Sequence, residues 1–265
     1  MRPWARAGSK AGAPSMTRFH IAVIGATLLG AAALLLGNRP LFVVVVLALL
    51  AVIGLGVALP QLSLFGPFVC RGTGAQRRVA LTFDDGPDAR STPALLDLLR
   101  DARAPAAFFC VGQRVAAERE LAARIVQEGH LLENHSYAHS NATNFFTAAG
   151  LRAELSRAQS AIQEATGVAP RLFRPPMGLS NPRIFRAARM LGLRVIGWSA
   201  RGLDTRISDP ERIVKRILRR LEPGAIILLH DGNIPPERLV VAVKMLLAKL
   251  RESGYEVVRL DRMLP

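Results

Sequence analysis

The 265-residue sequence contains only 2 cysteines, with 22 glycines and 17 prolines, while half of its residues are apolar. The low cysteine content excludes a disulfide-rich scaffold, and the glycine and proline contents exclude a collagen-like chain. The apolar content likewise excludes an intrinsically disordered protein. The cysteines do not reveal the redox compartment, because Cys110 lies in the apolar run 107–110 and is expected in the core.

Acidic residues are absent from the first 83 positions, whereas eight lysines and arginines occur up to Arg78. The formal net charge of +15 therefore has two sources, because the remaining segment carries 27 basic and 20 acidic residues. Its surplus suits an anionic polymer or a lipid surface. No DNA- or RNA-binding signature accompanies it, so we expect no nucleic-acid partner.

Two uncharged apolar runs occupy this leader, at residues 21–37 and 41–59. Each approaches the ~20 residues that a helix needs to cross a ~30 Å hydrocarbon core. A short Gly-Asn-Arg-Pro turn separates them, which favours a transmembrane helical hairpin. A buried core helix and a cleaved signal peptide are the alternatives. A signal peptide would be followed by a small-residue cleavage site, and here a second span follows instead.

Basic residues are distributed unevenly around the two spans. The tail 1–20 carries four of them, namely Arg2, Arg6, Lys10 and Arg18, and the turn carries Arg39. The positive-inside rule then predicts a cytoplasmic N-terminus, and two spans return the chain to the cytoplasm. We expect a two-pass protein of the bacterial inner membrane. The side that its C-terminal domain faces stays open, because the chemistry inferred below is more often needed outside.

From residue 78 onward, short strand-like runs alternate with amphipathic helical stretches, which predicts an α/β fold with mainly parallel strands. Seven strands are expected, at residues 79–83, 106–110, 131–133, 172–174, 194–197, 225–229 and 256–259. Six helices are expected between them, at residues 93–102, 116–128, 148–166, 182–191, 210–220 and 238–252. Residues 60–77 are interpreted as a linker and 78–265 as one domain.

In such a fold the ligand site lies at the carboxyl ends of the strands, so the polar residues that follow each strand carry most weight. The first strand runs into Asp84 and Asp85, which Gly-Pro follows. Adjacent carboxylates repel, so one of them needs a cation or a raised pKa. A solvated turn is the alternative explanation of the Asp-Gly-Pro sequence.

The third strand runs into a segment that contains His135 and His139. On one helical turn, residues four positions apart project from the same face, and these two could share a metal. An incidental pair is the alternative. Three further strand ends carry residues of the same kind, namely Arg174, Asp204 and His230. Their number favours a common site.

These residues, in this order, resemble the motifs of the polysaccharide deacetylases of carbohydrate esterase family 4, also called the NodB homology domain. The motifs are Thr-Phe-Asp-Asp-Gly-Pro at 82–87, His-Ser-x-x-His at 135–139, Arg-Pro-Pro at 174–176, Trp198 with Asp204, and Leu-Leu-His at 228–230. The resemblance covers residues 78–265. It implies a distorted (β/α)7-type barrel behind the hairpin and hydrolysis of N-acetyl groups from amino sugars.

The resemblance also implies a divalent metal held by Asp85, His135 and His139, with open positions for water and the substrate carbonyl. Zinc is the default for two histidines and one carboxylate, and manganese, cobalt or nickel could occupy the same ligands.

Further roles follow from the same motifs. Asp84 would be the general base, which Arg174 pairs with and keeps ionised. His230 would be the general acid for the leaving amine, and Asp204 would fix its tautomer and favour its charged form. The oxyanion would receive the backbone N–H of Met177.

Two positions depart from the family pattern and affect the expected substrate pocket, which Leu228 and Trp198 would line. Met177 stands where Tyr or Phe commonly follows Arg-Pro-Pro, and Thr205 replaces the aromatic residue that commonly follows the motif aspartate. A backbone contact survives the first change. The second removes a ring that helps line the pocket for the acyl methyl, so the acyl group and the sugar stay open.

The resulting hypothesis is a metal-dependent hydrolase that removes N-acetyl groups from amino sugars of a glycan, either peptidoglycan or an exported polysaccharide. One alternative is a deacylase of a lipid-linked sugar at the cytoplasmic membrane face, which the inferred topology favours. The other is a noncatalytic glycan-binding protein that keeps the fold. The sequence argues against the latter, because every expected catalytic position is filled.

Overall fold

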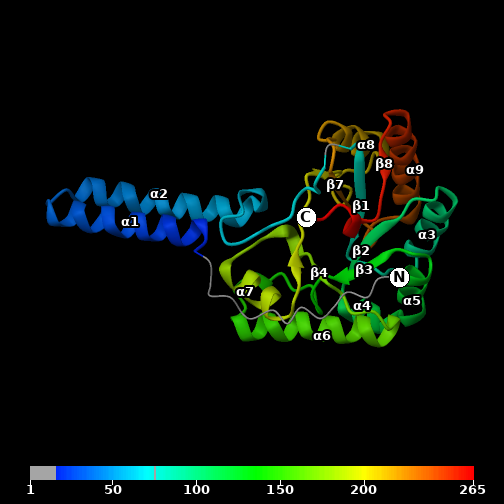
Figure 1. Ribbon diagram of the computed structural model, residues 1–265, viewed down its shortest axis with the longest axis horizontal. Helices are drawn as coiled ribbons and strands as arrows, with labels where there is room; N and C mark the ends of the chain where they lie inside the picture. The colour runs from blue at the N-terminus through cyan, green and yellow to red at the C-terminus, as the bar shows by residue number, and fades with distance from the viewer. Residues whose placement is uncertain (1–15, 75) are drawn as a thin grey trace.

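The computed structural model describes residues 16–74 and 76–265. Two long N-terminal helices, α1 (Arg18–Leu35) and α2 (Arg39–Ala58), extend away from an α/β domain (Figure 1). Of the basic tail expected at 1–20, residues 1–15 with Arg2, Arg6 and Lys10 lie outside the described residues.

The two N-terminal helices form a hairpin close to the expected spans. The side chain of Asn38 accepts a hydrogen bond from the Leu41 N–H at 3.1 Å, and proline occupies the first turn of α2, so its start is well capped. Both helices are long and apolar enough to cross a membrane, with mean hydropathies of 1.7 and 3.1, and only 11% of each span is buried. A core helix would be mostly covered by protein, which these helices are not.

The domain is built around eight short strands. They are β1 (Arg78–Asp84), β2 (Ala106–Cys110), β3 (Leu131–Asn134), β4 (Leu172–Phe173), β5 (Arg194–Val195), β6 (Ala200–Arg201), β7 (Ile226–His230) and β8 (Glu256–Val257). The order is β5-β4-β3-β2-β1-β7-β6, and β8 pairs with the beginning of β1. Every strand pair is parallel, and the curled sheet is the distorted barrel that the motifs predicted. β6 was not expected, because two residues are too few to give an alternating pattern.

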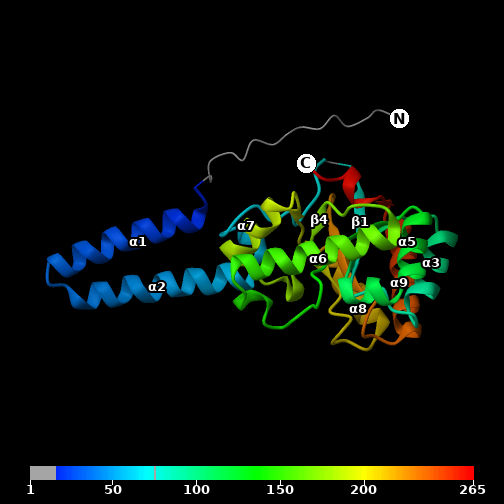
Figure 2. The ribbon, with the colours of Figure 1, turned by 90° about the horizontal axis from the view of Figure 1, so that it is seen from below.

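Helices cover the outside of this sheet (Figures 1 and 2). They are α3 (Thr92–Asp101), α4 (Gly112–Ala117), α5 (Arg119–Gln127), α6 (Ala148–Thr166), α7 (Pro182–Met190), α8 (Pro210–Leu218) and α9 (Pro236–Glu252). The single helix expected at 116–128 is wrong, because Glu118 has φ −115° and ψ 53°, which end α4 and begin α5. α6 agrees with its caps: Thr147 accepts from the Gly150 N–H, and Gly167 ends the helix with φ +73°.

Side chains along each strand point alternately into two apolar layers, and this alternation determines where the site can form. Phe83 and Phe108 stack on each other at 5.3 Å between the sheet and the helices, and both are fully buried. The even-numbered β1 residue Ala80 instead belongs to an inner cluster with Leu228 of β7. Because side chains alternate along a strand, the even-numbered residues at the ends of β1 and β7 also point into the barrel.

Part of the segment 60–77, which was interpreted as a linker, packs onto the domain. Phe65 and Phe68 are buried, which a free linker would not allow. Val69 forms a parallel bridge with Ile196 beside β5. Arg71 forms an antiparallel bridge with Ala225, the residue directly before β7. The segment therefore contributes to closing the barrel and also holds the hairpin close to it.

Candidate active site

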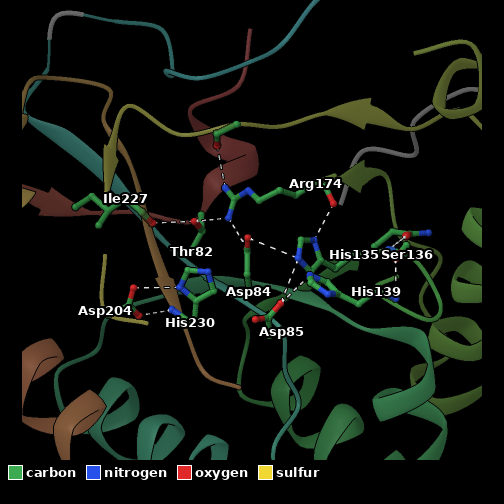
Figure 3. Close-up of polar contacts among 12 residues, drawn as sticks. Thr82, Asp84, Asp85, His135, Ser136, His139, Arg174, Asp204, Ile227 and His230 are labelled. Atoms are coloured by element: carbon green, nitrogen blue, oxygen red, sulfur yellow. Dashed lines mark hydrogen bonds and ion pairs between the residues drawn. The ribbon is translucent and has the colours of Figure 1, made fainter. Parts of the chain in front are cut away.

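The register of β1 and β7 brings two predicted site residues together. Asp84 and His230 are paired neighbours at the carboxyl ends of these parallel strands. Both are even-numbered, so their side chains enter the mouth of the barrel, as Figure 3 shows. Arg174 follows β4 and Asp204 follows β6, so four strand ends contribute to one site.

The three predicted metal ligands also meet at this mouth. Asp85 Oδ1 lies 3.4 Å from His135 Nε2 and 3.2 Å from His139 Nε2, and the candidate ligand atoms all lie within 4.8 Å of one another. The Nδ1 atom of His135 lies 2.7 Å from the carbonyl oxygen of Arg174, so a proton on Nδ1 leaves the Nε2 lone pair for a cation. Two imidazole nitrogens and one carboxylate form a donor set that suits a catalytic zinc-type site.

Electrostatics keep Asp85 and His139 in the forms that bind a cation. Burial alone would raise the pKa of the Asp85 carboxyl, but the imidazoles of His135, His230 and His139 hold it well below its usual range. Burial, reinforced by the neighbouring His135, lowers the pKa of His139. An ionised carboxylate beside a neutral imidazole is the state that a divalent cation requires.

The spacing of the two histidines indicated a helical turn, but the structure has a tight turn of another kind. His135 directly follows β3, and a tight turn with Ser136 at φ +64° and His139 at φ +49° brings the second ring back beside the first. Ser136 Oγ accepts from the His139 N–H at 3.2 Å, and Asn134 Oδ1 accepts from the Ser136 N–H at 2.9 Å. Asn134 in turn donates to the Leu155 carbonyl of α6 at 2.9 Å, so the turn is anchored in the core.

Asp84 is held by a fully buried guanidinium. Arg174 Nη1 donates to Asp84 Oδ1 at 2.6 Å and to Thr82 Oγ1 at 2.8 Å, while Nη2 donates to the Gly197 carbonyl at 2.9 Å. The guanidinium carbon also lies 4.1 Å from the centre of the Phe109 ring. Burial lowers the pKa of Arg174, and the contact with Asp84 partly offsets this lowering. A guanidinium stays protonated in proteins, so Arg174 presents a positive charge to Asp84. The second oxygen, Asp84 Oδ2, remains on the side of the metal-ligand cluster.

His230 lies on the other side of Asp84 and is paired with Asp204 (Figure 3). Asp204 Oδ1 lies 3.1 Å from His230 Nδ1, and Asp204 Oδ2 accepts the His230 backbone N–H at 2.7 Å. Burial lowers the pKa of His230, but Asp204, together with Asp84 and Asp85, raises it to about 9. The imidazole is therefore protonated at neutral pH, with Nδ1–H directed to Asp204 and Nε2–H left for a substrate.

The expected substrate-binding residues differ in exposure. Met177 lies on the rim within a short 3-10 helix (Pro176–Gly178), with φ +58° and 48% of its surface exposed. Trp198 and Leu228 are only 8% and 4% exposed and belong to the inner cluster. The indole ring packs so tightly on Gly178 that a side chain there would clash. Trp198 and Leu228 are therefore buried inside the barrel, and their contact with substrate stays a prediction.

Asp231 is a buried member of this region that sequence reasoning missed. Its N–H donates to the Asp84 carbonyl at 3.0 Å, Oδ2 accepts from Thr92 Oγ1 at 2.7 Å, and its carbonyl accepts from the Ser91 hydroxyl. Its carboxylate lies directly against Gly86, where no Cβ would fit. Burial and the neighbouring carboxylates raise its pKa to about 7. Asp231 thus holds the turn after β1, and its position next to the last motif histidine was the available signal.

Comparisons with known proteins agree with this geometry. The family model for polysaccharide deacetylase matches residues 71–196, after the hairpin. A peptidoglycan-N-acetylglucosamine deacetylase of Bacillus cereus is 34% identical over 191 residues, which are 71% of this chain and 89% of the relative. A chitooligosaccharide deacetylase of Bradyrhizobium is 36% identical over 193 residues, 68% of this chain and 88% of the relative.

Solved structures give the same relationship. The Bc1960 peptidoglycan N-acetylglucosamine deacetylase has a TM-score of 0.71 at 28% identity and covers 74% of this chain and 92% of its own. A CE4 family pseudoenzyme from Bacillus anthracis has a TM-score of 0.70 at 27% identity and covers 75% of this chain and 69% of its own. With this fold, and with two relatives at least 34% identical over most of their length, the chain belongs to the polysaccharide deacetylase family of hydrolases.

Proposed function

We propose that this enzyme is a metal-dependent N-deacetylase that hydrolyses N-acetyl groups from amino sugars of a glycan, such as peptidoglycan or an exported polysaccharide. The observation that carries the proposal is the Asp85, His135 and His139 cluster, with Asp84 on one side and His230 beyond it. The names of the two relatives, one acting on peptidoglycan and one on chitooligosaccharides, support an N-acetylated amino sugar as substrate.

Asp85, His135 and His139 would hold one divalent cation, with zinc as the default and manganese, cobalt or nickel as alternatives. When bound, the cation would polarise the amide carbonyl and acidify a water molecule. The contact between His135 Nδ1 and the Arg174 carbonyl already orients the ring of the first histidine ligand.

Asp84 would take the proton of the attacking water. Arg174 occupies Oδ1, so Oδ2, which lies 3.8 Å from His135 Nε2, is the atom left to accept it. The new bond joins the water oxygen to the acyl carbon. The oxyanion that forms would receive the backbone N–H of Met177 at the rim.

His230 would complete the reaction as general acid. Its Nδ1 is engaged by Asp204, so Nε2–H is the proton available to the sugar nitrogen. The C–N bond breaks as this proton arrives, and acetate and a free amino sugar leave. Because the pKa of His230 is raised to about 9, the ring carries the required proton at neutral pH.

Deacetylation of N-acetylated chitooligosaccharides by the detergent-solubilised full chain tests this proposal. Mass spectrometry should show a loss of about 42 Da for each converted sugar, which is the mass of the acetyl group replaced by hydrogen. Chelation should abolish the reaction and a divalent cation should restore it. Asp97→Asn, an exposed acid of α3, serves as the matched control for Asp84→Asn. Stoichiometric metal without activity on any N-acetylated sugar would contradict the proposal.

A lipid-linked amino sugar is a second candidate substrate, and one contact favours it. Ser180 Oγ lies 3.4 Å from the carbonyl oxygen of Gly56, in the last turn of α2. Ser180 lies only six positions after Arg174 in the chain, so the site lies within about 20 Å of the end of the hairpin. A sugar carried on a membrane lipid would lie close to the end of the hairpin and could therefore reach the site.

We also propose that the hairpin is a two-pass anchor in the bacterial inner membrane. The length, composition and exposure of α1 and α2 support an anchor. A C-terminal fusion to a phosphatase or a fluorescent protein reports which side the domain faces. Fluorescence without phosphatase activity would support the lipid-linked substrate, and the reverse would support peptidoglycan or an exported polysaccharide.

A further inference from the structure

One helix beside the hairpin presents a positive face that the site does not use. α7 carries Arg183, Arg186 and Arg189, and all three are exposed. At 100° per residue they lie within about 120° of one another, whereas Ile184 and Ala188 on the other side of the helix are buried. The arginines therefore form one outward face.

The sequence carries no acidic residue between Glu164 and Asp204, so neither α7 nor its flanking segments contain one. Among the ion pairs of the described residues, none involves the three α7 arginines. Arg183 donates to the Asn144 carbonyl at 3.0 Å and so also holds the neighbouring loop, whereas Arg186 and Arg189 are fully available. Uncompensated arginines on one helix face attract an anionic surface.

The same end of the domain exposes apolar side chains. Phe145 is 82% exposed and adjoins Asn144, while Met177 and Met190 are 48% and 55% exposed before and at the end of α7. Aromatic and flexible apolar side chains interspersed with arginines are typical of surfaces that lie at a membrane interface. The face therefore offers both headgroup contacts and shallow apolar insertion.

The position of α7 relative to the hairpin is fixed by contacts. Its Phe185 ring packs on Phe68, 5.7 Å between centres, in the chain that leaves α2. At the other leg of the hairpin, the Phe19 N–H donates to the Leu64 carbonyl at 3.0 Å. Ser180, two residues before α7, reaches the last turn of α2. Both views place α7 at the end of the domain nearest the hairpin (Figures 1 and 2).

We infer that the α7 arginine face binds the anionic phospholipid headgroups of the bilayer that holds the hairpin. Nine helical residues span about 13 Å, so the whole face lies within about 20 Å of the end of the spans. Docking would orient the barrel mouth at a constant height above the lipid and select sugars near the membrane surface. This inference rests on the membrane anchor included in the proposed function.

Proximity of α7 to headgroups is measurable in vesicles that contain the full chain. A fluorophore is attached at Met190→Cys in a Cys70→Ser background, since Cys110 is buried. Nitroxide-labelled headgroups then quench it on contact. Quenching is expected in vesicles with roughly 30 mol% phosphatidylglycerol, and it should fall in phosphatidylcholine alone or in about 1 M salt. A fluorophore at Val241 on α9, also exposed, should stay unquenched.

Charge-matched variants separate this face from general basicity. Arg186→Gln with Arg189→Gln should reduce the ratio of docked to undocked protein about 30-fold, and the corresponding lysine pair should retain it. Arg212→Gln with Arg216→Gln removes the same charge from exposed positions on α8 and should change nothing. The inference would be overturned by equal quenching in both lipids. It would also be overturned if the α8 double variant lost as much quenching as the α7 double variant.

Activity on a soluble chitooligosaccharide keeps the two proposals distinct. Both double variants should deacetylate it like the parent chain, which also shows that they fold. Loss of quenching with full soluble activity is the result that supports the lipid-binding face. If the fluorophore on the parent protein is quenched normally but the protein lacks deacetylase activity, the proposed function is contradicted and the lipid-binding face is still supported.

Discussion

Replacing Asp204 by asparagine should uncouple the proposed general acid from its partner while keeping the site assembled. Asp204 makes two contacts with His230, one to the backbone N–H and one to Nδ1. The amide oxygen of asparagine can keep the first contact, and its NH2 group then faces Nδ1. The ring loses a negative neighbour and its charged form is no longer favoured.

The size of the effect follows from the pKa of His230, which burial lowers and Asp204 raises from 6.5 to about 9. At pH 7.5 a pKa of 9 leaves roughly 97% of the ring protonated, whereas a pKa of 6.5 leaves roughly 9%. The acid would therefore be available about tenfold less often. With a cation bound nearby, the alkaline limb of the parent enzyme is expected between 6.5 and about 9.

The assay is kcat/KM on a chitooligosaccharide as a function of pH, together with the metal content of each sample. In Asp204→Asn the alkaline limb should move to lower pH and the maximum should fall, with metal content unchanged. Asp209→Asn is the matched control, because Asp209 only caps α8 by accepting from the Glu211 N–H. An alkaline limb that stays in place in Asp204→Asn would refute the role of His230 as the acid.

Three further outcomes are expected. Asp84→Asn should retain metal but lose about 10²–10⁴ in kcat, because an amide cannot accept the proton, and metal analysis with steady-state kinetics checks both parts. His135→Ala should lose metal and activity together, and stoichiometric metal in the double variant with His139→Ala would contradict the ligand assignment. Gly178→Ala should lower the free energy of unfolding by at least ~2 kcal/mol, because Gly178 has φ +66° and abuts an indole ring. Gly129→Ala should lower it by about 1 kcal/mol in the same denaturant titration, because Gly129 has φ +87° but open space around it.

The order of strands and helices was predictable because the domain repeats one pattern. Apolar runs of about five residues alternate with capped amphipathic stretches, and each cap acts locally. The unexpected elements depend on tertiary contacts. β6 has two residues, and its place is set by pairing with β7. The break at Glu118 leaves no Gly or Pro in the sequence to announce it.

The residues at the mouth of the barrel were predictable from strand ends and motif order, but their geometry was not. His135 and His139 meet through left-handed backbone in a turn, although their spacing also fits a helix. Asp231 was not predicted, because it contacts the backbone of the turn after β1. Sequence spacing contains no information on such backbone hydrogen bonds, which only the folded chain defines.

Arg174 is the residue whose burial most needs a functional reason. Burying a guanidinium costs several kcal/mol, and replacing a buried ion pair by apolar side chains is often neutral or stabilising. Its Nε has no partner among the described residues, so the network is not even complete. Its side chain, however, fixes Asp84 Oδ1 at 2.6 Å, and its carbonyl lies 2.7 Å from His135 Nδ1. One residue thus orients the proposed base and a proposed metal ligand together, and stability alone would not retain this charge in the core.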